Sequence, residues 1–127
     1  MRPGCMNKST AELAVRRDFV NSLVFLLYAV LVAIVSLRPM SGASIDPWDK
    51  VLHFIVYAVF AVLGYQALKK GRRYFYVCLG IIAYGALIEV AQSYMPGRVM
   101  SGYDLLANTL GVVFGAVIVS RLGPDAR

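Results

Sequence analysis

Charge is scarce in this chain. Charged residues make up 16% of its 127 residues and hydrophobic residues 59%, whereas a soluble domain carries about 25% charged residues. Cysteine is also rare: Cys5 lies in a basic N-terminal segment and Cys78 in an apolar run, so no disulfide framework is expected. The single histidine, His53, excludes a zinc site with two histidines from one chain.

Four long apolar runs account for most of the sequence. Runs of about 17 to 25 apolar residues indicate transmembrane helices, and the predicted helices cover residues 19–37, 51–68, 74–94 and 104–122. The first run exceeds a signal-peptide core and precedes no small-x-small cleavage site, so it is interpreted as a retained helix. The prediction is an all-α, integral membrane four-helix bundle. It is one domain over residues 1–127, with residues 1–18 as a basic cytoplasmic tail.

The basic residues predict how the bundle is oriented. Ten of the thirteen precede the first helix, join the second to the third, or lie at the C-terminal end of the chain. The other three, Arg38, Lys50 and Arg98, lie on the opposite side. Because positive residues stay cytoplasmic, both termini are predicted inside the plasma (inner) membrane, in a multi-pass topology. The net charge of +6 is thus explained by topology and by anionic lipid headgroups, and a nucleic-acid partner is rejected.

Six polar residues in or beside the last three apolar runs fall near the predicted outer end. They form three pairs at helical spacing: Asp49 with His53, Glu89 with Gln92, and Asp104 with Asn108. Residues three or four apart share a helix face, so three helices are expected to bring these groups together in one layer. His53, Glu89 and Asn108 are predicted to lie deeper than the other three. Small residues continue the same faces inward, which favours close helix packing at the cytoplasmic end.

Several of these residues also have purely structural interpretations. Asp49, in "DPWD", and Asp104, in "SGYD" after Ser101, fit helix N-termini as caps or first-turn acids. His53 and Asn108 fit structural hydrogen bonds between helices. Glu89 is harder to explain, because an acid in a membrane helix costs up to about 3 kcal/mol and needs a partner. A structural ion pair remains an alternative for it.

A family resemblance is carried by "DKVLHFIVYAVFAVLGY" and "IEVAQSYMPGRVMSGYDLLANTLGVVFG". These segments, with "SLRPM" at 36–40, resemble the VanZ-like family of small bacterial membrane proteins. The resemblance covers residues 36–115 and singles out the same polar positions found above. It implies a cell-envelope role, since the founding member is associated with resistance to the glycopeptide teicoplanin. The resemblance does not imply any particular reaction.

Three functions follow from these patterns. The first is an outward-facing pocket that binds an anionic group, such as a lipid-linked cell-wall precursor or a phospholipid headgroup. Its ligand-binding candidates are Lys50, Gln92, Arg98, Asp104, Asn108 and Arg38. The second is a membrane enzyme acting on a lipid phosphate, whose catalytic candidates are His53, Glu89 and Asp49. The third is a structural or assembly protein without a ligand.

The cofactor question stays open at this stage. The polar groups require no cofactor, yet they offer a mostly oxygen shell that suits magnesium, manganese or calcium. The residues available for such an ion are Asp49, His53, Glu89, Asp104 and Asn108. A homo-oligomer is also left open, and the bilayer itself is the one partner that the composition requires.

Overall fold

The computed structural model describes residues 7–39, 46–68 and 72–123, and four α-helices make up nearly all of this part. They are α1 (Lys8–Ser36), α2 (Pro47–Leu68), α3 (Arg72–Gln92) and α4 (Gly102–Leu122). The described ranges contain no β-strand. Each helix is long and apolar enough to cross a membrane. The predicted all-α membrane fold is confirmed.

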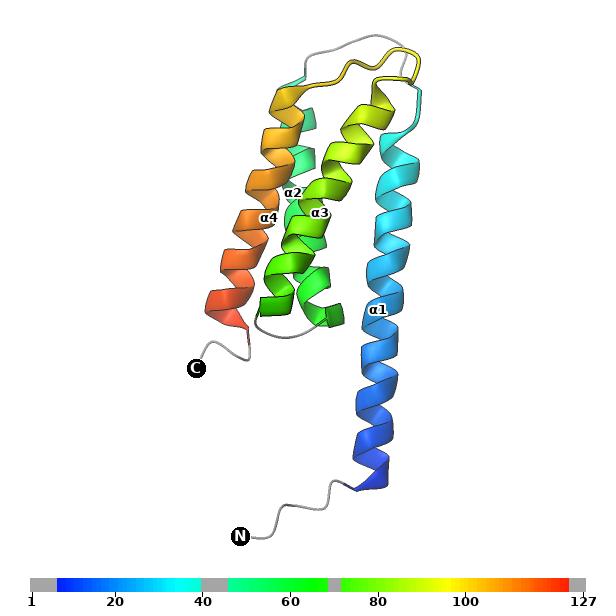
Figure 1. Cartoon of the computed structure of the whole chain (residues 1–127), viewed down its shortest axis with the longest axis vertical. Helices are drawn as coiled ribbons and strands as arrows, with labels where there is room; N and C mark the ends of the chain where they lie inside the picture. Colours follow the sequence, from blue (N-terminus) through cyan, green and yellow to red (C-terminus); the bar gives the residue numbers. More distant parts are fainter. Residues whose placement is uncertain (1–6, 40–45, 69–71, 124–127) are drawn as a thin grey trace.

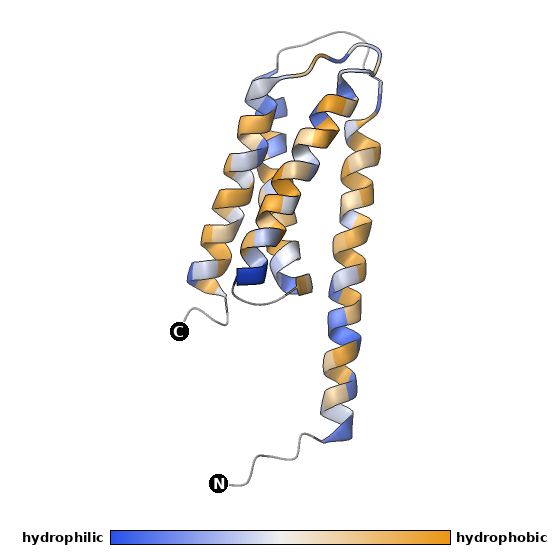
Figure 2. Ribbon diagram, in the orientation of Figure 1, coloured by the Kyte–Doolittle hydropathy of each residue, from blue (hydrophilic) through white to orange (hydrophobic). Residues whose placement is uncertain are grey.

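The helices lie alongside one another. One end of the bundle, called the shared end below, holds the C-termini of α1 and α3 and the N-termini of α2 and α4. Figure 1 shows α2, α3 and α4 side by side, while α1 extends well beyond them at its N-terminal end. This extension begins at Lys8, so much of the predicted 1–18 tail is helical. Its "AELAVRR" sequence is rich in strong helix formers, which carry the helix past the apolar run. Most of the remaining helix surface is apolar, as a membrane requires (Figure 2).

Two glycines set the close approach of α2 and α4. A Cβ atom on Gly111 would lie 2.3 Å from the backbone oxygen of Phe54, and one on Gly115 would lie 2.5 Å from that of Ala58. Neither oxygen can move without shifting the whole of α2. Small residues allow such backbone-to-backbone packing in membranes. The predicted small-residue seam therefore holds the two helices that carry most of the polar residues.

An aromatic cluster joins the other helices to α2. The ring of Phe60 lies 5.1 Å from that of Phe25, 5.4 Å from that of Tyr28 and 5.6 Å from that of Tyr84. The two tyrosine hydroxyls donate to backbone oxygens of neighbouring helices, Tyr28 to Val56 at 2.8 Å and Tyr84 to Ala29. Each hydroxyl thus finds an acceptor where water is absent. The cluster fixes α1 against α2 and α3. The polar groups lie closer to the end of the bundle where α2 and α4 begin.

Candidate functional site

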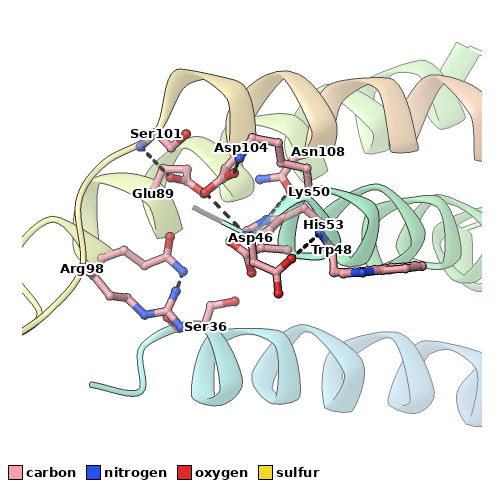
Figure 3. Close-up of polar contacts among 12 residues, drawn as sticks. Ser36, Asp46, Trp48, Lys50, His53, Glu89, Arg98, Ser101, Asp104 and Asn108 are labelled. Carbon is pink, nitrogen blue, oxygen red and sulfur yellow. Dashed lines mark hydrogen bonds and ion pairs between the residues drawn. The ribbon is translucent and has the colours of Figure 1, made fainter. Parts of the chain in front are cut away.

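His53 and Asn108 link α2 to α4 at the shared end of the bundle. Nδ1 of His53 lies 2.8 Å from Oδ1 of Asn108, so this nitrogen is the hydrogen-bond donor. The other ring nitrogen, Nε2, lies 3.8 Å from Oδ2 of Asp49 and 4.0 Å from Oδ2 of Asp104. Figure 3 shows the imidazole between the two helices, next to Asp104 and Asn108. The histidine is thus held at one nitrogen and presents the other to two carboxylates.

Asp104 belongs to this cluster and does not form a capping box. In a capping box its carboxylate would accept the backbone N–H of Ser101, but that N–H points to Oε2 of Glu89, 3.5 Å away. The Ser101 side chain makes no cap hydrogen bond either. Instead, Oδ1 of Asp104 lies 3.8 Å from Nζ of Lys50. Asp104 is only 9% exposed, so its carboxylate lies inside the bundle.

At the start of α2, capping is performed by Asp46. Its Oδ1 accepts the backbone N–H of Trp48 at 3.0 Å, as expected for a residue just before Pro47 at the first helical position. The nearby carboxylate of Asp49 is therefore available to face His53. Its side chain is 48% exposed, so it lies where the cluster meets solvent.

Glu89 is fully buried and has little to compensate its charge. Its exposed fraction is 0%, and Oε2 receives only the long contact from Ser101. Among the described residues, Oε1 has no hydrogen-bond partner, and no ion pair within 4.0 Å is formed by either oxygen. The structural ion pair considered for Glu89 is thus not seen in the described part of the chain. A buried carboxylate with so few partners is destabilising.

Gln92 and Arg98 turn toward the end of α1. The Gln92 side-chain nitrogen donates to the backbone oxygen of Ser36 at 2.8 Å, and Nε of Arg98 donates to that of Arg38 at 3.0 Å. The first bond satisfies a carbonyl that the C-terminus of α1 leaves unpaired. Gln92 thereby joins α3 to α1, and Arg98 joins the α3–α4 connection to the segment after α1, where the Arg38 side chain is exposed. The terminal nitrogens of Arg98 stay available for an anion.

Several buried polar atoms near this cluster have no hydrogen-bond partner among the described residues. They are Oε1 of Glu89, Oδ1 of Asp104, Nδ2 of Asn108 and the hydroxyl of Tyr57. The 3.8 Å ion pair of Asp104 with Lys50 is too long for a hydrogen bond. Buried polar groups are otherwise almost always paired. These unpaired atoms make the cluster a candidate site.

Tyr57 was not predicted as a site residue. It is 2% exposed and lies one turn below His53 on α2, and its ring packs against Gly85, which is one turn below Glu89 on α3. In the sequence, Tyr57 lies on the same face of the second predicted helix as His53, toward the small residues, and this position favoured a packing role. The i, i+4 spacing from His53 was the available signal that its hydroxyl extends the polar face.

These features define a small multi-pass membrane protein with a buried polar cluster at one end of its bundle. A scan against protein-family models matches residues 6–123 to the VanZ/LLP1 family. The chain belongs to the VanZ/LLP1 family, and the resemblance found in the sequence is confirmed. Searches of curated proteins and of solved structures returned no match.

Proposed function

We propose that this protein binds a phosphate-bearing lipid headgroup at a polar site on the outer side of the plasma membrane. The chemistry is shared by phospholipids and by lipid-linked cell-wall precursors. A precursor as ligand would also connect the protein to teicoplanin resistance. The observation that supports the proposal best is the set of buried, unpartnered polar atoms on three helices at one end of an apolar bundle. The contacts of Glu89, Asp104 and Asn108 within the protein leave one polar atom of each side chain unpartnered.

The charges favour a ligand with two parts. Lys50 has a 35% exposed side chain, and Arg98 and Arg38 lie at the same end, so a phosphate at the rim would meet several cations. Arginine suits bidentate contacts to phosphate and lysine acts as a point charge. The carboxylates of Glu89 and Asp104 lie deeper and need donors. A headgroup that carries a phosphate and an adjacent amine, hydroxyl or cation fits both levels.

An apolar groove favours a lipid over a free anion. A groove of about 310 Å³ lies between α2 and α4, the helices that hold His53 and Asn108, and it is lined only by apolar side chains. Those residues are Phe54, Ile55, Ala58, Val59, Val62, Leu63, Phe114 and Ile118. Phe54 follows His53 directly, so the groove begins close to the polar cluster. A lipid tail in this groove would place its headgroup near the site.

The outward orientation can be tested by thiol labelling in intact cells. In a chain with Cys5→Ser and Cys78→Ala, Val99→Cys should react with a membrane-impermeant maleimide, because Val99 is 77% exposed in the α3–α4 connection. Glu12→Cys, near the exposed start of α1, should react only after the membrane is permeabilised. The reverse labelling pattern would place the site on the cytoplasmic side and end the proposal of an outer ligand.

Lipid binding can be measured by native mass spectrometry of the purified protein. Phosphatidylglycerol and a polyprenyl phosphate should bind, and diacylglycerol, which lacks phosphate, should not. Lys50→Met should weaken binding roughly tenfold or more, since a charge-assisted hydrogen bond contributes about 1.5 to 3 kcal/mol. Arg17→Met, an exposed cation on α1 far from the cluster, is the matched control and should bind normally.

Comparing the two phosphate lipids in this experiment shows which class of lipid is the ligand. Preference for the polyprenyl phosphate points to a cell-wall precursor, and preference for phosphatidylglycerol points to a bulk phospholipid. Competition by inorganic phosphate alone, at equal affinity, would show that the lipid part is irrelevant. Equal binding of diacylglycerol, or equal binding by Lys50→Met, would contradict the proposed headgroup site.

An enzyme acting on a lipid phosphate is the second candidate, and the position of His53 favours it. Nε2 is fixed by the bond at Nδ1 and lies beside two carboxylates, an arrangement suited to a general base or nucleophile. Purified wild-type protein would then release inorganic phosphate from a polyprenyl phosphate, and His53→Ala would not. Glu89 and Asp49 would position or charge-stabilise the imidazole. Absence of phosphate release by the lipid-binding wild-type protein would leave the binding function alone.

A further inference from the structure

We propose that Asp49, His53 and Asp104 bind one divalent transition-metal ion, and that Asn108 orients the histidine ligand. One donor atom from each of the three residues lies within 4.8 Å of the other two. Metal–nitrogen and metal–oxygen bonds of about 2.0 to 2.2 Å place neighbouring ligands about 3 Å apart. The separations from Nε2 are 3.8 and 4.0 Å and the donor atoms lie up to 4.8 Å apart, so binding requires a contraction of about 1 to 2 Å. Asp49 can supply it, because its side chain is half exposed.

The hydrogen bond to Asn108 determines which nitrogen is free. Because Nδ1 donates to Oδ1 of Asn108, a neutral imidazole carries its lone pair on Nε2. That lone pair then faces the carboxylates of Asp49 and Asp104, which is unfavourable unless something positive lies between them. Metal-bound histidines commonly donate their second ring N–H to an oxygen in this way. The amide of Asn108 thus acts as the outer-shell hydrogen-bond partner of the histidine ligand.

The charge balance favours a divalent ion over a proton. Asp49, Asp104 and Glu89 are three carboxylates, and Lys50 is the one cation that forms an ion pair with them among the described residues. With a neutral imidazole these groups sum to a charge of about −2 when all three acids are ionised. A proton on His53 removes half of this excess, whereas a divalent ion removes all of it.

Independent support comes from Glu89, which is not one of the three ligands. It is 0% exposed with one oxygen unpartnered, and Figure 3 shows it beside Asp104. A wholly buried carboxylate next to an acidic cluster would be stabilised by positive charge bound there. One imidazole and two carboxylates suit Mn²⁺, Fe²⁺ or Zn²⁺ better than Ca²⁺, which prefers an all-oxygen shell. Of the three ions considered from the sequence, manganese is the one that this set retains.

Manganese alone, without phosphate lipid, is the probe for this site. Titration of metal-free protein in a non-ionic detergent, followed by electron paramagnetic resonance, should show one tightly bound Mn²⁺ per chain. His53→Ala and Asp49→Asn should each weaken binding by about tenfold or more, and Asn108→Ala by about tenfold to a hundredfold. Since His53 is the single histidine, the bound ion should show coupling to one imidazole nitrogen that disappears in His53→Ala.

Two further variants separate this proposal from headgroup binding. Lys50→Met should bind Mn²⁺ at least as tightly as the wild type, because it removes a cation 3.8 Å from Asp104, although it should weaken lipid binding. Asp46→Asn keeps the helix cap and removes an acid outside the cluster, so it should not change Mn²⁺ affinity. No stoichiometric binding, bound Mn²⁺ without nitrogen coupling, or weaker binding by Lys50→Met would each overturn the metal site and leave the lipid result untouched.

Discussion

Gly111→Ala is expected to lower the stability of this protein strongly. The added Cβ would lie 2.3 Å from the backbone oxygen of Phe54 and 3.1 Å from the backbone nitrogen of Ala58. Backbone atoms inside a helix cannot rotate away as a side chain can, so α2 and α4 must separate. Overpacking of this kind costs about 3 kcal/mol. The hydrogen bond between His53 and Asn108, one turn above, should be lost with the helix contact.

Gly80 provides the matched control for this change. It also lies in the middle of a membrane helix, but a Cβ there would meet nothing within 4 Å. Gly80→Ala should therefore keep or slightly raise the unfolding temperature, because alanine favours helix. Thermal unfolding in detergent, followed by circular dichroism, compares the two variants directly. Equal unfolding temperatures for Gly111→Ala and Gly80→Ala would show that the tight α2–α4 contact is not present in the folded protein.

Glu89→Gln should keep or raise the stability of the protein and weaken its lipid binding. The amide keeps the shape of the side chain and removes a buried charge that has no cation within 4.0 Å among the described residues. We therefore expect an unfolding temperature equal to or above that of the wild type, since a group held for function is often destabilising. Binding of phosphatidylglycerol should fall about tenfold or more, because a charged acceptor for its glycerol hydroxyls is lost.

The control for Glu89 is a polar residue without a role in the cluster. The hydroxyl of Thr109 donates to Leu105 in its own helix at 2.9 Å, so Thr109→Val should leave both stability and lipid binding nearly unchanged. A lower unfolding temperature of Glu89→Gln with normal lipid binding would make Glu89 a structural residue. Thermal unfolding and native mass spectrometry on the same samples distinguish the two outcomes.

The sequence predicted the fold well because membrane helices obey a length rule. Apolar runs indicated all four helices, and the ends of α2 and α4 fall within a few residues of the predicted ones. The start of α1 differed, because residues 8–18 are charged and hydropathy cannot reveal a helix that leaves the membrane. The small-residue seams indicated close packing, but the structure was needed to show that Gly111 and Gly115 bring α4 against α2.

The site was predictable in its members but not in its contacts. Helical spacing placed His53, Asp104 and Asn108 together, whereas "SGYD" allowed Asp104 to be either a cap or a site residue. The structure shows that Asp104 does not complete a capping box, because the Ser101 N–H points to Glu89 instead. Periodicity also could not show that Gln92 and Arg98 reach the carbonyls of α1. Such contacts depend on the distances between helices, which no single helix pattern contains.

The single histidine allows the most direct test of the proposed site. Protein with ¹⁵N-labelled histidine, reconstituted in bilayers with the tighter-binding phosphate lipid, can be examined by ¹⁵N–³¹P dipolar recoupling in solid-state NMR. Because His53 has a side chain only 13% exposed and is the sole labelled residue, a coupling reports a phosphate at the cluster. We predict dephasing of the His53 signal by ³¹P in the wild type and its loss in Lys50→Met. A His53 signal that ³¹P leaves unchanged in lipid-bound wild-type protein would contradict headgroup binding at this site.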